Sequence, residues 1–404
     1  MPTQRTAAAP PAILFLVLPY GISSGFVSVT LPFLLVQHGF SVAMAASITA
    51  LGLSSNLWRF AWAPFTDLTL SLHKWWLIGT GFSSASLVLL CLIPLNLNVS
   101  GLLTVIVFLS QIAATFVVAP VGGFMAKTIT EDKKGRAGGW YQAGNLGGVG
   151  LGGGAGIWLS THFSYQAAGI VLALASLACG AALYFVPQVY AEKGTLQNRF
   201  RIMMVDLKQL FRSRIALFST VIIITPIGIG AATYVWSSMG KDWQVTDDTV
   251  ALVTGVLSGG VSAIGCLFGG WVADKLGRWW SFFGAGIIMA LVTLIMALAH
   301  FNRFTFIGGI LCYAFSVGWA NAAFSAVVLL AIGKELASTK YALLSSISNL
   351  APVYMTAFDG WMHDAYGIRG MLMAETLLGF GFSILFLLIL SKAKLDRQLL
   401  QPEG

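Results

Sequence analysis

Charged residues are scarce in this chain. Asp, Glu, Lys and Arg together make up 9% of its 404 residues, whereas soluble domains carry about 25%. Hydrophobic residues make up 57%, which is more than the core of a soluble fold needs. A bilayer does need them, because it is an apolar solvent around every helix that crosses it. The composition predicts an integral membrane protein, long enough for about twelve spans.

Cysteine is also rare, and the signatures of several enzyme classes are missing. The four cysteines lie inside apolar runs, without metal-ligand or redox spacing. The sequence has no G-x-x-x-x-G-K-[ST] loop and no H-E-x-x-H motif, so direct use of ATP and zinc-dependent hydrolysis are not expected. The pattern G-x-G-x-x-G at Gly148, Gly150 and Gly153 follows no strand, which excludes a dinucleotide site. We expect no metal, no cofactor and no enzymatic activity.

Twelve apolar runs are long enough to cross a membrane as helices, and their boundaries define the predicted spans. They lie near residues 12–36, 43–63, 75–94, 101–126, 137–160, 166–187, 215–239, 249–272, 280–299, 304–331, 341–361 and 370–391.

The basic residues are distributed unevenly across these spans. If the N-terminus is cytoplasmic, nineteen of the 23 Lys and Arg residues fall on the cytoplasmic side and three on the other, while Arg59 lies within a span. This asymmetry predicts an even number of spans with both termini cytoplasmic. The net charge of +8 is therefore a topology signal, and we do not expect nucleic-acid binding.

The longest connection divides the chain into two parts of similar length. Residues 188–214 carry six basic residues and an apolar stretch with helical spacing, Phe200 to Phe211, which predicts a linker helix lying along the cytoplasmic interface. The predicted organisation is an N-terminal six-helix bundle at 1–187, this linker at 188–214, and a C-terminal six-helix bundle at 215–404.

The two parts also repeat each other. Pro19 and Gly21 in the first span correspond to Pro226 and Gly228 in the seventh, 207 residues later. Two further correspondences keep nearly the same offset: Asp67 with Asp274, and Asn145 with Asn349. Three ordered matches at half the chain length indicate duplication of a six-span unit, which predicts a solute site between the halves near the bilayer midplane.

A nine-residue segment at the end of the eighth span resembles the loop motif of major facilitators. In Gly270–Arg278 an acidic residue, Asp274, ends one helix, and Arg278 follows a tight turn containing a glycine. The resemblance implies a charge clasp at the cytoplasmic gate, in which the carboxylate holds a helix N-terminus or an Arg in one conformation only. It also implies the major facilitator fold of two pseudo-symmetric six-helix bundles.

The corresponding segment of the first half, Arg59–Asp67, is more specific. A basic residue, two apolar residues, Trp-Ala-Pro and an aspartate three residues later resemble the branch that contains AmpG muropeptide permeases, acetyl-coenzyme A transporters and small siderophore permeases. The position that is usually Lys in this branch is Arg59 here. The chain length is closer to that of the siderophore permeases. Arg59 and Asp67 are accordingly gating candidates, although Arg59 could instead extend to the cytoplasmic surface.

Two further acidic residues lie within predicted spans. Asp359 is near the outer end of span eleven, and Glu375 is about two turns into span twelve. A carboxyl group in a membrane can exchange protons. One of them is predicted to couple transport to the proton gradient; Asp359 is preferred, and Glu375 is more consistent with a structural role.

Neutral polar and aromatic residues at mid-span depth are candidates for solute contact. The alternative for the amides is that they only bond neighbouring helices. The candidates are Tyr20, Gln111, Gln142, Asn145, Trp236, Trp319, Asn321 and Asn349.

Span five is rich in glycine, with ten glycines between residues 138 and 156. Gly144, Gly148, Gly152 and Gly156 share one helix face, which predicts close approach and sliding of a neighbouring helix. Exporters of the superfamily often carry a proline in a glycine motif on this helix, so its absence here favours import.

These observations together predict a secondary transporter of the bacterial inner membrane. The interpretation is a proton-coupled importer of an organic solute, either a siderophore or a peptidoglycan-derived muropeptide, working as a monomer by alternating access. The alternative is an exporter of drugs or metabolites from the same superfamily.

Overall fold

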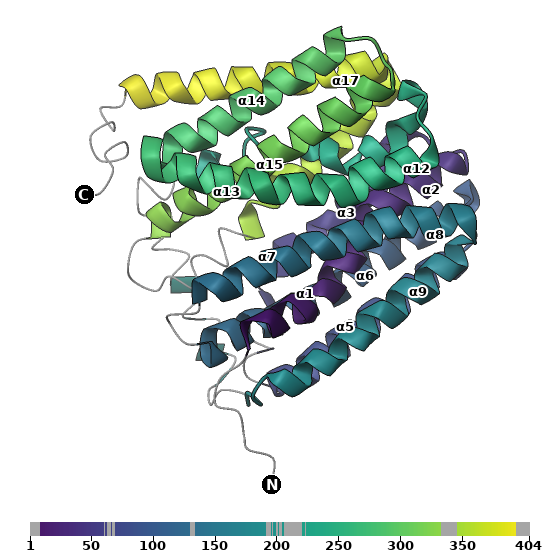
Figure 1. Ribbon diagram of the computed structural model, residues 1–404, viewed down its shortest axis with the longest axis vertical. Coiled ribbons are helices and arrows are strands. Elements are labelled where there is room, and N and C mark those ends of the chain that lie inside the picture. Colours follow the sequence, from purple (N-terminus) through teal and green to yellow (C-terminus); the bar gives the residue numbers. More distant parts are fainter. Residues whose placement is uncertain are drawn as a thin grey trace. The chain divides into compact units, whose positions relative to one another are not determined.

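The computed structural model describes residues 9–59, 61–62, 66, 69–129, 134–190, 195, 197–198, 201, 204–205, 220–222, 224–332 and 346–392, without the side chains of residues 10, 126, 134–139, 274, 325–332 and 389–392. Within these ranges every regular element is a helix. The chain forms two compact units, whose helices are traced by colour in Figure 1.

Unit 1 contains Met1–Phe40, Leu51–Arg201 and Asp247–Val256, and unit 2 contains Ser41–Ala50, Ile202–Thr246 and Leu257–Gly404. Each unit thus includes one short segment from the other half of the sequence. The predicted bundle boundaries at 187 and 215 stay a prediction, and most of the predicted linker at 188–214 lies outside the described residues.

In its described residues, unit 1 contains five helices of 14 to 29 residues, joined by shorter helical segments. They are α1 (Pro10–Gly25), η1 (Phe26–Thr30), α2 (Leu31–Gln37), η2 (Ser55–Trp58), α5 (Leu72–Leu92), η3 (Leu97–Val99), α6 (Ser100–Thr128), α7 (Lys134–Gly150), η5 (Leu151–Ala155), α8 (Gly156–His162), α9 (Tyr165–Ala178), η6 (Cys179–Phe185) and α12 (Asp247–Val250). Two further helices, α3 (Val42–Ser54) and η9 (Ala251–Leu257), each cross a boundary between the units.

The described part of unit 2 contains two short 3₁₀ helices and four long α-helices. They are η7 (Ala231–Tyr234), η8 (Trp236–Trp243), α13 (Ser258–Leu276), α14 (Arg278–Leu298), α15 (Arg303–Ile332) and α17 (Leu350–Lys392). The last of these reverses at Gly367, whose φ of 68° breaks the helix into two limbs. These limbs correspond to predicted spans eleven and twelve.

Eight helices in the described residues are long and apolar enough to cross a membrane. The predicted number of twelve is therefore supported only in part. The limbs of α17 are counted together as Leu350–Leu388, and the second predicted span is represented by the shorter apolar helix Val42–Trp58. Predicted span five is helical from Lys134 to His162, through α7, η5 and α8.

Glycines bring α1 and α7 together in unit 1, as the sequence predicted. A Cβ added at Gly144, Gly148 or Gly152 would overlap or crowd the backbone of α1, at Leu14, Leu18 and Ile22 respectively. Gly21 on α1 faces Gly148, and its own Cβ would lie 2.8 Å from the Gly148 Cα. The predicted close-contact face of span five is confirmed, because successive contacts are four residues apart on both helices.

Wider helical turns interrupt the same helices. The segments η1 and η5 are π-helical and lie against each other. A π-helical turn shifts the backbone hydrogen-bond register, and the Thr30 hydroxyl donates to the carbonyl oxygens of Gly152 at 2.7 Å and Gly153 at 2.9 Å. Thr30 thus joins η1 to η5.

Candidate functional site

Predicted span seven differs from a regular helix in the described residues. Residues 224–230, which we call the bend, form turns and irregular backbone before the short 3₁₀ helices η7 and η8. Pro226 cannot donate a backbone hydrogen bond, and Gly228 and Gly230 have φ of 66° and 70°, values that side-chain-bearing residues rarely adopt. The sequence analysis expected a continuous apolar span here because its residues are apolar; this proline and these two glycines explain the difference.

The bend lies directly against α15. A Cβ added at Gly230 would overlap the Val317 side chain, and one added at Gly228 would lie 3.3 Å from the Ala320 Cβ. The bend also contacts α17, because the Tyr354 hydroxyl on that helix donates a hydrogen bond to the Ile224 carbonyl oxygen at 2.8 Å. The irregular backbone is therefore a positioned feature of unit 2.

On one side of the bend lies a cavity of about 190 Å³ with a mixed polar and apolar lining, which we call the amide cavity. Two of the predicted solute-contact residues, Asn321 and Asn349, line it together. Hydroxyl and aromatic groups line it as well, at Thr233, Tyr234, Ser348, Phe282 and Phe324, and aliphatic side chains and glycines form the rest of the wall. None of the described residues that line it is charged. The cavity offers hydrogen-bond donors and acceptors to an uncharged polar group.

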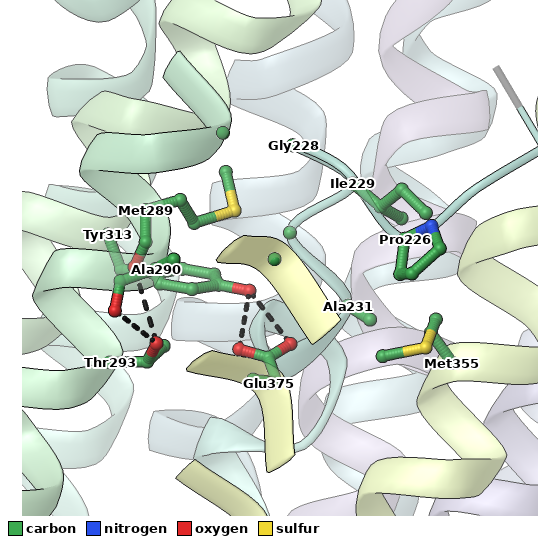
Figure 2. A pocket seen from close by; sticks show the side chains of 13 residues that line it. Pro226, Gly228, Ile229, Ala231, Met289, Ala290, Thr293, Tyr313, Met355 and Glu375 are labelled. Atoms are coloured by element: carbon green, nitrogen blue, oxygen red, sulfur yellow. Dashed lines mark hydrogen bonds between the residues drawn. The ribbon is translucent and has the colours of Figure 1, made fainter. Parts of the chain in front are cut away.

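The bend also lines a second, smaller space of about 20 Å³, which we call the acid pocket. Glu375 on the second limb of α17 accepts hydrogen bonds from the Tyr313 hydroxyl, at 3.1 Å to each carboxylate oxygen, as Figure 2 shows. One of these oxygens also accepts from the backbone N–H of Ala232 at 3.3 Å. Among the described residues, no Lys, Arg or His lines this pocket.

Asp359 on the first limb of α17 is fully buried beside this group. Neither of its carboxylate oxygens has a hydrogen-bond donor among the described residues. Its nearest interacting acid is Glu375, close enough for a hydrogen bond between the two carboxyl groups when one carries a proton. The reversal at Gly367 brings the two acids together, since each lies eight residues from that glycine. The structure thus unites the two residues that the sequence analysis treated as alternatives.

The predicted aromatic contacts of this unit lie apart from the amide cavity's lining residues. Trp236 is 1% exposed, and its ring meets that of Tyr313 edge-on at 5.4 Å. The Trp319 Nε1 donates to the Ser281 hydroxyl at 2.9 Å, joining α15 to α14. In this structure both rings make contacts between helices of unit 2.

The predicted solute-contact residues of unit 1 occupy mixed positions. The Gln111 amide donates to the carbonyl and hydroxyl oxygens of Ser23, at 3.3 and 3.2 Å, so it joins α6 to α1. The Tyr20 hydroxyl donates to Asn56 at 3.2 Å. Asn145 is half-buried and Gln142 is exposed.

The gating candidates are described only in part. Asp67 lies outside the described residues, and the side chain of Asp274 is not described. Arg59 is half-buried and has an interaction partner, and Arg278 is exposed. Gly277, between α13 and α14, has a φ of 94°, so the predicted tight glycine turn is confirmed.

Sequence reasoning did not find several groups at the two spaces, above all Tyr313, Thr233 and the Ala232 N–H. The Pro226, Gly228 and Gly230 pattern was the signal that could have found them. A proline and alternating glycines within an apolar run predict an unwound segment whose neighbours line a cavity.

The fold is that of a polytopic helical membrane transporter. The sequence matches the Major Facilitator Superfamily over residues 13–351 and, in a second match, over 216–403. The chain therefore belongs to this superfamily. No curated protein matches it at a significant level.

Solved structures of transporters share the fold at low sequence identity. The nucleoside transporter NupG, as its D323A mutant, is 10% identical with a TM-score of 0.72, covering 94% of this chain and 98% of that one. A POT family transporter in complex with 5-aminolevulinic acid is 10% identical with a TM-score of 0.72, covering 95% and 96%. A D-xylose-proton symporter is 14% identical with a TM-score of 0.66, covering 91% and 96%.

Proposed function

We propose that this protein is a proton-coupled importer of an organic solute in the bacterial inner membrane. Membership of the superfamily supports transport, and the fold it shares with a D-xylose-proton symporter makes proton coupling a natural hypothesis. In this proposal twelve spans form two six-helix bundles that work as a monomer by alternating access, with both termini cytoplasmic.

The observation that carries the proposal is the placement of the two acids. A buried carboxyl pair lies beside the bend, and the same bend lines the amide cavity. Ionisable groups inside a membrane protein are costly, and they mark proton or substrate pathways by default. Asp359 and Glu375 are therefore the proton-coupling candidates, and Asn321 and Asn349 are the solute-binding candidates of this unit.

The resemblance of Arg59–Asp67 to the AmpG-type branch supports a siderophore or a peptidoglycan-derived muropeptide as the solute. Both carry amide and hydroxyl groups that the amide cavity could bond. Asp67, Arg59, Asp274 and Arg278 are proposed to form the cytoplasmic gate, with Gly277 providing the turn. Export of a drug or metabolite is the second candidate function.

A two-stage experiment tests this function. Purified protein is first screened by thermal shift against ferric and iron-free siderophores, anhydro-muropeptides, nucleosides, dipeptides and pentoses. Labelled forms of the stabilising compounds are then offered to right-side-out membrane vesicles with an alkaline interior. An importer accumulates the compound, and a protonophore abolishes the accumulation. Accumulation only in inverted vesicles with an acidic interior would instead establish export.

Removing either cavity amide is expected to weaken solute binding. Asn321→Ala and Asn349→Ala each delete one hydrogen-bonding group, worth about 0.5–1.5 kcal/mol, so KM should rise roughly threefold to tenfold. Initial uptake rates over a range of solute concentrations measure this. Asn302→Ala, outside the amide cavity at the start of α15, is the matched control, and an unchanged KM in both cavity variants would contradict the proposal.

A further inference from the structure

One stretch of backbone, Gly228–Gly230, which we call the strip, lines two cavities of unit 2. Gly228, Ile229 and Gly230 line the amide cavity, and the same three residues line the acid pocket (Figure 2). A movement of this strip would change the shape of both spaces at once. Because α15 touches the bend through Val317 and also carries Tyr313, one helix contacts both the strip and the carboxyl pair.

Among the described residues, one backbone hydrogen bond joins Glu375 to the chain just beyond Gly230. Ala232, two residues beyond Gly230, donates its N–H to Glu375. An ionised carboxylate accepts such a bond more strongly than a neutral carboxyl group does. A proton on Glu375 would therefore weaken the contact that holds this end of the bend.

The two carboxyl groups cannot both be ionised at low cost. They interact directly, Asp359 is fully buried, and neither Asp359 oxygen has a donor among the described residues. Among the described residues, the Tyr313 hydroxyl from α15 and the Ala232 N–H from η7 face Glu375, and the two acids face each other from the two limbs of α17. The pocket's α14 residues, Gly286, Met289, Ala290 and Thr293, contribute no ionisable group. Two carboxyl groups in such surroundings favour a state in which they share one proton.

We propose that Asp359 and Glu375 bind one proton as a unit, and that the Ala232 hydrogen bond links this proton to the wall of the amide cavity. The inference rests on the proposed function where it takes the amide cavity as a solute site. Occupancy of the cavity and protonation of the pair then influence each other reciprocally, because both change the position of Gly228–Gly230. Tyr313 is a positioning residue, holding the Glu375 carboxylate toward Ala232.

The proton-sharing part is tested without any solute, by infrared spectroscopy of purified protein in lipid. At neutral pH the wild type is expected to show a protonated carboxyl band that shifts in D₂O. Asp359→Asn is expected to remove this band, because Glu375 keeps both of its donors. Asp364→Asn, which changes an exposed acid on the same helix, should leave the band in place. A band that persists in Asp359→Asn would overturn the shared proton.

The link to the bend is tested by hydrogen exchange of the peptide that covers Gly228–Ala232. Glu375→Ala removes the acceptor and should raise exchange roughly threefold to tenfold, whereas Leu377→Ala, two residues away and 71% exposed, should not. In the wild type, the exchange rate of this peptide is measured over a range of pH and corrected for the intrinsic pH dependence of amide exchange. The corrected rate should rise as the pH is lowered and the pair takes up its proton. Glu375→Gln should abolish that rise. This measurement on the wild type tests whether protonation of the pair affects the bend, even if a variant does not fold.

Two results would overturn the link, and both are independent of whether the solute is ever found. One is a bend whose exchange is the same in Glu375→Ala and Leu377→Ala. The other is exchange of the bend that changes when Na⁺ replaces K⁺ at constant pH but does not change with pH. That result would mean that the pair binds a metal cation. Failure of the vesicle uptake experiment, by contrast, would remove the proposed transport function and leave these two tests unaffected.

Discussion

Asp359→Asn and Glu375→Gln are each expected to abolish solute accumulation driven by a pH gradient. A gradient of one pH unit stores about 1.4 kcal/mol per proton, which supports about tenfold accumulation with one coupled proton. Either substitution removes one member of the carboxyl pair, so inside and outside concentrations should become roughly equal. The double variant should be no worse than either single variant, because a shared site is lost only once.

Counterflow provides the control for this prediction, since exchange of labelled for unlabelled solute needs no net proton movement. Both single variants should retain counterflow while losing accumulation. Asp364→Asn should retain both, because that carboxylate is exposed. Partial losses that add up in the double variant would show that the two acids act independently and would contradict the shared site.

The sequence predicted those features that depend on residues close together in the chain. The register of Gly144, Gly148 and Gly152 follows from helical periodicity, and α1 packs on that face as expected. The turn at Gly277 could be predicted because a glycine lies between two apolar runs, where it marks a turn. Membership of the superfamily agrees with the resemblance of the segment that contains this turn.

The carboxyl pair could not be predicted in this way, because it depends on how a helix folds back on itself. Asp359 and Glu375 are sixteen residues apart in the sequence, and a straight helix would separate them by about 24 Å. The φ of 68° at Gly367 reverses the chain between them. Glu375 is also held by Tyr313 and Ala232, which come from other helices. Hydropathy carries no information about such contacts.

Span seven illustrates a second limit. Its hydropathy is that of a helix, and hydropathy decided the expectation of a continuous span over 215–239. The structure instead has the bend and two 3₁₀ helices in the described part of that range. The repeat partner of Pro226, Pro19, lies inside the regular helix α1. Equivalent residues of the two halves therefore have different local structures, and Gly230 with its φ of 70° contributes to the difference.

Gly152→Ala is expected to cost the most stability of any such replacement among the glycines of unit 1 whose surroundings the structure describes. The added Cβ would overlap the Ile22 carbonyl oxygen and lie 2.8 Å from both the Ile22 carbonyl carbon and the Phe26 nitrogen. All three atoms belong to the backbone, so no side chain can rotate away to relieve the overlap. Relief requires α1 and η5 to separate, which also stretches the bonds from Thr30 to Gly152 and Gly153.

The expected cost is at least about 2 kcal/mol in the free energy of unfolding, the order of magnitude of overpacking in a rigid core. Gly147→Ala is the matched control, since it lies five residues earlier on α7 and its Cβ would meet nothing within 4 Å. There alanine should be neutral or stabilising, because it restricts the unfolded chain more than glycine does. Thermal unfolding of the two purified variants in one detergent measures the difference. Equal melting temperatures would mean that α1 and η5 can separate without cost, and that the glycine face does not set their distance.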